Sequence, residues 1–137
     1  IVGFPGEKEE YFNELVEYVK SVKFDRLGVF TYSREEGTAA YNFDDQIPER
    51  IKNLRRDMIM KIQQNISAQK NKEKLNHVYP AMVEEQLEED LYAGRTYMDS
   101  PEIDGVLYIE SNKELQIGNF YNVRITDSLE YDLIGEV

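Results

Sequence analysis

The first residues of the chain, Ile1-Val2-Gly3-Phe4-Pro5-Gly6-Glu7, combine two glycines, a proline and a carboxylate where an expected strand becomes a helix. In parallel α/β folds, ligands bind at the carboxyl ends of strands, and glycines there let a ligand approach the backbone. The N–H groups at the start of the helix are free to bind polar ligands. Glu7 could therefore accept hydrogen bonds from a nucleoside. For the segment in isolation, a simpler interpretation is favoured, in which Pro5-Gly6 is a turn and Glu7 an acidic residue of the first helical turn.

A second polar segment, residues 32–38, follows the next expected strand and should open onto the same end of the fold. Arg34 could bind a carboxylate or a phosphate with its planar guanidinium. Glu35 and Glu36 could act as an acid–base pair, but adjacent acidic residues on a loop are more often merely solvated. In isolation, this segment is again a weak indication of a site.

A third polar segment, residues 95–105, joins two expected strands near the end of the chain. A loop of this length in so small a domain favours contact with a partner. The alternative is a solvated hairpin loop in which Asp104-Gly105 forms the turn.

Cysteine is absent, and His77 is the sole histidine. Disulfides, thiolate metal sites, thiol nucleophiles and three-histidine metal sites are therefore excluded within this chain. The chain also starts without methionine, in what looks like the end of a buried strand. We therefore expect a piece of a longer protein, in which any redox or metal chemistry comes from residues outside this chain.

The charge is distributed very unevenly. Residues 1–76 contain 13 Lys and Arg and 13 Asp and Glu, whereas residues 77–137 contain 3 and 14, so the whole net charge of −11 lies in the last part. A phosphate backbone is bound by Lys and Arg, which are scarce there. A basic protein partner suits this surface better than RNA does, although acidity could equally serve only solubility. No apolar run approaches the roughly 18–20 residues of a membrane span, so we expect no membrane association.

Hydrophobic periodicity predicts an α/β part followed by a long helix. A strand, a helix at 7–22 and a buried strand at 26–32 form a βαβ unit, which implies parallel strands. The long helix should run from about Pro48 to about Leu75. Its expected apolar stripe consists of Ile51, Leu54, Met58, Ile62 and Ile66.

After His77 the pattern changes to five short strands punctuated by glycines. Five short antiparallel strands in about 60 residues are typical of a small OB-like barrel. Pro80 should lie at a strand edge or a bulge, because proline has no N–H to donate. The expected strands are 78–83, 91–97, 106–110, 120–126 and 131–136.

Four segments of the chain together resemble one family, the radical S-adenosylmethionine methylthiotransferases. They are residues 1–7, residues 24–38, Gln46-Ile47-Pro48-Glu49 and the third polar segment. In that last segment, Gly94-Arg95-Thr96-Tyr97 followed by Pro101-Glu102-Ile103-Asp104-Gly105 resembles a TRAM domain. It points to the RimO-type branch of the family, which modifies a ribosomal protein.

The resemblance implies the C-terminal part of a radical S-adenosylmethionine α/β barrel at residues 1–46, a linker helix at 47–76 and an all-β, five-stranded, OB-like TRAM barrel at 77–137. It also implies S-adenosylmethionine and two four-iron–four-sulfur clusters in the complete enzyme, with every cluster cysteine upstream of Ile1. One cluster would cleave S-adenosylmethionine reductively to start radical chemistry, and the other would help to deliver sulfur. The target would be the β-carbon of an aspartate in small-subunit ribosomal protein twelve, in the cytoplasm. The isolated chain should be inactive.

The resemblance also implies roles for particular residues, none of them catalytic and none a metal ligand. Cofactor contacts would come from Gly3, Pro5, Gly6 and Glu7, and substrate contacts from Arg34, Thr38, Arg95, Glu102 and Asp104. Lys8 and Ala39 stand where the family usually has threonine and proline, which leaves the path of the loop near the pocket open.

Two other functions remain possible from the sequence. The tRNA-modifying branch of the same family is similar upstream, and TRAM barrels elsewhere often bind RNA. The acidity of residues 77–137 favours a basic ribosomal protein as the partner of this chain over RNA.

Overall fold

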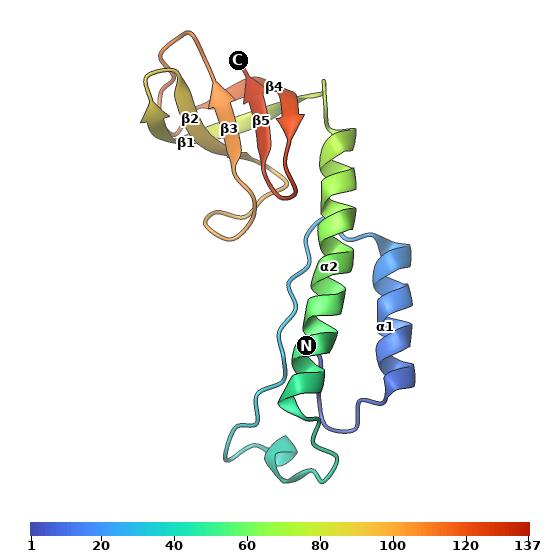
Figure 1. Ribbon diagram of the computed structural model, residues 1–137. Helices are drawn as coiled ribbons and strands as arrows, with labels where there is room; N and C mark the ends of the chain where they lie inside the picture. The colour runs from blue at the N-terminus through green and yellow to red at the C-terminus, as the bar shows by residue number, and fades with distance from the viewer. The chain divides into compact units, whose positions relative to one another are not determined.

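The computed structural model describes residues 1–137 as two compact units, residues 1–66 and residues 67–137. The boundary falls within a long helix, so that helix contributes to both units (Figure 1). In chain order the elements are α1 (Glu9–Val22), the 3-10 helix η1 (Ala39–Asn42), α2 (Glu49–Glu73), β1 (Val78–Glu88), β2 (Leu91–Thr96), β3 (Leu107–Glu110), β4 (Phe120–Ser128) and β5 (Leu133–Glu136).

Helix α1 forms where the sequence predicts it. Its first turn carries Glu9 and Glu10, whose charges favour the positive end of the helix dipole, and Lys20 lies in its last turn. One face is buried at helical spacing, and the core of the first unit consists of Val2, Phe12, Val16, Val19 and Ile59.

The expected buried strand at residues 26–32 is instead an extended segment with a single parallel bridge between Val2 and Thr31. Two hydrogen bonds form the bridge: the Val2 N–H donates to the Phe30 carbonyl (2.9 Å), and the Tyr32 N–H donates to the Val2 carbonyl (2.8 Å). The parallel direction agrees with a βαβ connection. The segment is not fully buried, since it has a partner along one edge only and Phe30 is 72% exposed.

The buried face of α2 differs from the apolar stripe expected for it. Leu54 and Met58 are half exposed, whereas Lys52, Ile59 and Gln63 are buried. Periodicity missed this face because two of its residues are polar by type. The aliphatic stem of Lys52 packs like an apolar side chain, and the Gln63 amide donates to the Phe24 carbonyl at 2.7 Å.

The second unit contains a closed barrel with the strand order β1-β2-β3-β5-β4. All five predicted strands are present, and fold class is confirmed as a small all-β barrel accompanied by helices. The prediction that every strand is antiparallel is wrong, because β3 and β5 pair in parallel. The reason is topological: the path from β3 through β2, β1 and β4 to β5 reverses direction four times, so a closed ring of five strands cannot alternate throughout.

The interior of the barrel is filled by alternate residues of the strands. In β2, for example, Tyr92, Gly94 and Thr96 are buried and their neighbours are half exposed. The buried core of the second unit comprises Ala81, Val83, Tyr92, Leu107, Ile109, Leu115, Val123, Ile125 and Leu133.

Pro80 lies where β1 has a partner on one side only. It is opposite Asn122 of β4, whereas the pairing of β1 with β2 begins one residue later, at Ala81. On the edge of β1 that faces β2, the missing N–H of Pro80 therefore costs no hydrogen bond, as expected of a proline at a local edge.

The end of α2 is tied to the loop between β4 and β5. The Asn71 side chain is fully buried, and its Nδ2 donates to the carbonyls of Leu129 and Glu130, each at 3.3 Å. After the helix, the Asn76 N–H donates to the Ile125 carbonyl (2.8 Å). Neither helix is long and apolar enough to cross a membrane.

Candidate functional site

The segment expected to hold a ligand folds as a tight turn from Phe4 to Glu7. The Glu7 N–H donates to the Phe4 carbonyl at 3.0 Å, and Gly6 adopts a positive φ of 82°. Pro5 followed by a glycine at positive φ is the pattern of a type II turn. The Gly6 N–H also donates to the Asp45 carbonyl (2.9 Å), which attaches the turn to the loop before α2.

The Glu7 carboxylate is the centre of a polar network inside the first unit. Its Oε1 accepts hydrogen bonds from the Gly3 N–H (3.0 Å) and from Arg55 Nη1 (2.6 Å). The same Nη1 donates to the Glu7 carbonyl at 2.9 Å. The ion pair is well shielded, because the side chains of Arg55 and Glu7 are only 11% and 15% exposed. The sequence analysis missed Arg55, since nothing in the pattern links residues 48 positions apart.

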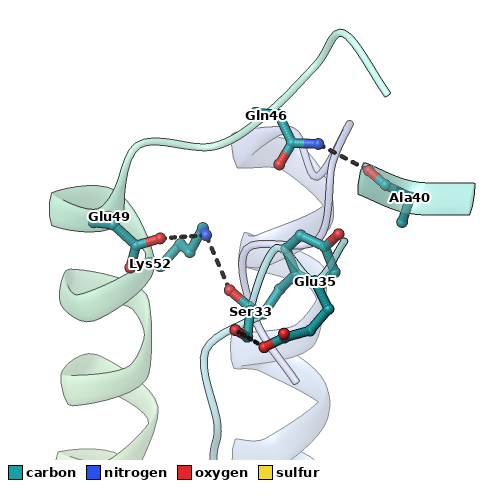
Figure 2. A network of polar contacts seen from close by, with 7 residues as sticks. Ser33, Glu35, Ala40, Gln46, Glu49 and Lys52 are labelled. Carbon is teal, nitrogen blue, oxygen red and sulfur yellow. Dashed lines mark hydrogen bonds and ion pairs between the residues drawn. The ribbon is translucent and has the colours of Figure 1, made fainter. Parts of the chain in front are cut away.

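Gly3 is in close contact with Lys52. Gly3 has a φ of 77°, and an added Cβ would lie 2.3 Å from Lys52 Cγ. The Lys52 ammonium donates to the Tyr32 carbonyl (2.9 Å) and pairs with the Glu49 carboxylate (2.5 Å), and Figure 2 shows the contact with Glu49. The side chain cannot easily move, so the glycine at position 3 is explained by this helix rather than by a ligand.

A pocket of about 300 Å³ lies beside the turn. It is lined by Pro5, Asn42, Phe43, Asp44 and Asp45. Its lining is mainly polar, with two exposed carboxylates, and Gly6 next to it has open space where a Cβ would be, with Asp45 Oδ2 the nearest atom at 3.8 Å. These groups can accept hydrogen bonds from hydroxyls or attract a cation.

Aromatic rings surround the same end of the two chain segments. Phe4 packs edge-on against Tyr32 and Phe43, with ring centroids 5.2 and 6.2 Å apart. The Tyr32 hydroxyl is buried and has no hydrogen-bond partner. The end of the expected βαβ unit thus combines a glycine turn, carboxylates and aromatic rings.

Arg34 and Thr38, expected to contact substrate, stabilise the loop that carries them. Arg34 Nε donates to the Tyr41 carbonyl (2.8 Å), and its guanidinium lies 4.6 Å from the centroid of the Tyr41 ring. Thr38 Oγ1 donates to the Glu35 carbonyl (2.8 Å). Both residues are exposed, and neither lines the pocket beside Pro5.

Two further side chains close this loop on itself, as Figure 2 shows. Ser33 Oγ donates to Glu35 Oε1 at 2.6 Å, and Gln46 Nε2 donates to the Ala40 carbonyl at 2.9 Å. The acid–base role considered for Glu35 and Glu36 gains no support from this arrangement, since Glu35 accepts a hydrogen bond from a serine on the same exposed loop.

The barrel brings the other three expected substrate residues together. Arg95, Glu102 and Asp104 line one pocket of about 140 Å³, to which Glu84 also contributes. Arg95 Nε donates to Glu84 Oε1 at 2.6 Å, across the β1–β2 pair. The pocket therefore has three carboxylates and one guanidinium, which is already paired.

The loop that forms this pocket is held by short-range hydrogen bonds. Asp104 Oδ2 accepts from the Ser100 N–H (2.7 Å), and Thr96 Oγ1 donates to Asp99 Oδ2 (3.3 Å). At its end, Asp132 accepts from the Val106 N–H (2.9 Å). The loop has a defined path because three carboxylates bind its backbone or its side chains.

No group of three or more His, Cys, Asp or Glu side chains in the chain is arranged to hold a metal ion. Iron–sulfur clusters are held mainly by cysteine thiolates, and the chain has no cysteine. The residues present therefore do not fit an iron–sulfur cluster, and no step of a reaction can be assigned to one within this chain.

Comparison with known proteins agrees with the barrel and extends over the whole chain. Residues 77–137 match the family model of the TRAM domain. The chain is 50% identical over 137 residues to the ribosomal protein uS12 methylthiotransferase RimO of Clostridioides difficile (strain 630), 54% identical to that of Clostridium novyi (strain NT) and 53% identical to that of Clostridium botulinum (strain Okra / Type B1). In each case the whole chain is covered.

The chain spans about a third of the length of these relatives, 31% in each case, and corresponds to their C-terminal part. The matched TRAM range coincides with the closed barrel and the residues that lead into it. The chain therefore resembles RimO-type methylthiotransferases throughout its length, as their C-terminal part, and residues 77–137 form a TRAM domain.

Proposed function

We propose that this chain is the C-terminal part of a methylthiotransferase that modifies ribosomal protein uS12 by radical S-adenosylmethionine chemistry. The observation that supports the proposal most is the 50–54% identity, over all 137 residues, to proteins named ribosomal protein uS12 methylthiotransferase RimO. The presence of a ribosomal substrate would place the reaction in the cytoplasm. The cluster cysteines would be supplied by the part of the enzyme outside this chain.

In this proposal, the turn at residues 3–7 and the pocket beside Pro5 hold S-adenosylmethionine. The residues fit such a ligand: the backbone at Gly6 is open, and the carboxylates of Asp44 and Asp45 suit its hydroxyls and its positive charge. Gly3 and Glu7 would support the turn from behind, since each is engaged with helix α2 or with the other. When bound, S-adenosylmethionine would supply both the radical and the methyl group.

The barrel would bind the protein substrate through its charge. Residues 77–137 carry the entire net charge of −11, and ribosomal proteins are basic because they bind RNA. Arg95, Glu102 and Asp104 lie in one pocket of this domain, where the excess of carboxylates suits a lysine or arginine side chain of uS12. Arg34 and Thr38 would act by shaping the loop next to the cofactor, with contacts to substrate made by the same loop.

The activity is tested with the full-length gene in a bacterial strain whose own uS12-modifying gene has been deleted. Mass spectrometry of uS12 should show the added methylthio group only when the gene is expressed. Methylthiolated adenosine in tRNA, measured in the same cells, should stay at the level of the empty vector. Modified tRNA with unmodified uS12 would overturn the assignment in favour of a tRNA-modifying enzyme.

The role of the barrel is tested with purified full-length enzyme and two binding partners, uS12 and tRNA. Binding to uS12 should weaken as the salt concentration rises, because the attraction is between opposite charges. Tight binding to tRNA with little affinity for uS12 would show that the barrel is an RNA-binding module instead.

A further inference from the structure

Arg55 contacts the turn at residues 3–7 in a way that fixes its shape. Its Nη1 donates to two atoms of Glu7, the backbone carbonyl (2.9 Å) and the carboxylate Oε1 (2.6 Å). One donor therefore fixes both the backbone position and the side-chain rotamer of Glu7. The same Oε1 accepts from the Gly3 N–H (3.0 Å), so this second hydrogen bond within residues 3–7 depends on where Arg55 holds the carboxylate.

The environment makes this contact stronger than an exposed ion pair. The two side chains are 11% and 15% exposed, and the guanidinium lies 5.3 Å from the centroid of the buried Phe12 ring. Exposed ion pairs contribute little, whereas removing one partner of a shielded pair leaves the other charge without compensation. Loss of Arg55 should therefore disturb Glu7 rather than merely free it.

Lys52, one helical turn before Arg55, acts on the same turn through shape. Its stem packs against Gly3, and its ammonium donates a hydrogen bond to the Tyr32 carbonyl of the neighbouring segment. Helix α2 thus contacts both the turn that contributes Pro5 to the pocket and the neighbouring extended segment at Tyr32.

We propose that Arg55 is a positioning residue for S-adenosylmethionine: it does not touch the cofactor, but it holds Glu7 and the Gly3 N–H so that the turn keeps its binding shape. The inference rests on the proposed function, which places the cofactor at this turn. It adds a residue of helix α2, Arg55, that holds the turn in its binding conformation.

The test measures S-adenosylmethionine binding to full-length, cluster-reconstituted enzyme by anaerobic equilibrium dialysis. Arg55→Gln and Glu7→Gln should each weaken binding about tenfold, and the double variant should be no weaker than the worse single variant within about twofold, because both remove one shared interaction. Arg55→Lys should recover part of the loss, since it keeps the charge but not the guanidinium geometry.

Arg56→Gln is the matched control. Arg56 is the next residue of the same helix, is 40% exposed and pairs only with its neighbour Asp57 at 2.8 Å. Its removal should leave S-adenosylmethionine affinity within about twofold of wild type, because exposed pairs contribute little. In steady state, Arg55→Gln should raise KM for S-adenosylmethionine and leave KM for uS12 unchanged.

Wild-type affinity in Arg55→Gln, or losses that add fully in the double variant, would overturn the inference. If Arg55→Gln fails to fold, Arg55→Lys and Glu7→Gln decide it, and wild-type affinity in both would contradict it. The binding assay is independent of the proposed reaction: an enzyme that binds S-adenosylmethionine but never modifies uS12 refutes the function and leaves this inference to be judged on affinity alone.

Discussion

Position 3 accepts only glycine for two separate reasons. Its φ of 77° is unfavourable for any residue with a Cβ, and a Cβ there would lie 2.3 Å from the buried Lys52 stem. Lys52 cannot yield easily, because its ammonium is fixed at the Tyr32 carbonyl and the Glu49 carboxylate. The unfavourable backbone conformation and the clash with Lys52 would therefore both oppose a side chain at position 3.

Gly3→Ala should therefore destabilise the full-length enzyme by about 2–4 kcal/mol, the sum of a left-handed backbone cost and an overpacking cost. Gly37→Ala is the control, since Gly37 has a φ of 82° but nothing within 4 Å of an added Cβ. It should lose only about 1–2 kcal/mol, from the backbone alone. Chemical denaturation followed by circular dichroism measures both, and equal losses would show that Lys52 gives way.

At the scale of elements, the loop between β3 and β4 is held to the barrel by tyrosine hydroxyls. The Tyr92 hydroxyl, on a fully buried side chain of β2, accepts from the buried Leu115 N–H at 3.2 Å. The Tyr121 hydroxyl accepts from the Gln116 N–H at 2.9 Å, but that contact is exposed to water. The two hydrogen bonds are chemically alike and differ in solvation.

Tyr92→Phe should cost about 1–3 kcal/mol, because it leaves a buried N–H without an acceptor. Tyr121→Phe should cost under about 1 kcal/mol, since water can replace the lost hydroxyl. Thermal unfolding of the two variants under identical conditions provides the comparison. A larger loss in Tyr121→Phe would mean that burial does not determine which hydroxyl matters.

The attachment of the end of α2 to the loop after β4 depends on one amide. Asn71→Ala removes both hydrogen bonds to the carbonyls of Leu129 and Glu130 from a fully buried position, and should cost about 1–3 kcal/mol. Asn65→Ala, at an exposed position of the same helix, should be neutral or slightly stabilising because alanine has the higher helix propensity. Hydrogen exchange should also rise in residues 129–132 of Asn71→Ala only.

At the scale of the whole molecule, charge distinguishes the barrel domain from the rest of the chain. Negative charge is concentrated in the hairpin formed by β1 and β2, where Glu85, Glu88, Glu89 and Asp90 are all exposed. Helix α1 carries the same number of exposed acidic residues, Glu9, Glu10, Glu14 and Glu17. The two sets allow the same change of net charge to be made in two different units.

Under the proposed function, neutralising the hairpin set with Gln and Asn should raise KM for uS12 about fivefold at low salt and make KM less sensitive to salt, because complementary charges would steer and hold the substrate. Neutralising the α1 set should leave KM for uS12 within about twofold, if the barrel is the docking surface. Steady-state kinetics from low to physiological salt measure both. Equal effects of the two sets would indicate a response to total charge rather than to the barrel.

Most of the local structure could be predicted from the sequence. Periodicity identified both helices and all five barrel strands, although β1 ends at Glu88 rather than at 83 and the buried face of α2 is not the predicted apolar stripe. The charge asymmetry and the motifs of residues 1–7 and 94–105 were equally readable, and the similarity to RimO agrees with them. These features depend on neighbours in the chain.

Only the tertiary structure revealed which residues of the chain contact one another across long sequence distances. The contact of Arg55 with Glu7, the packing of Lys52 on Gly3 and the parallel pairing of β3 with β5 all join residues that are distant in the chain. Local periodicity contains no term for such contacts, and it misjudges a buried Lys or Gln because burial there depends on a distant acceptor. The candidate residues of the site were therefore visible in the sequence, whereas the groups that hold them in place were not.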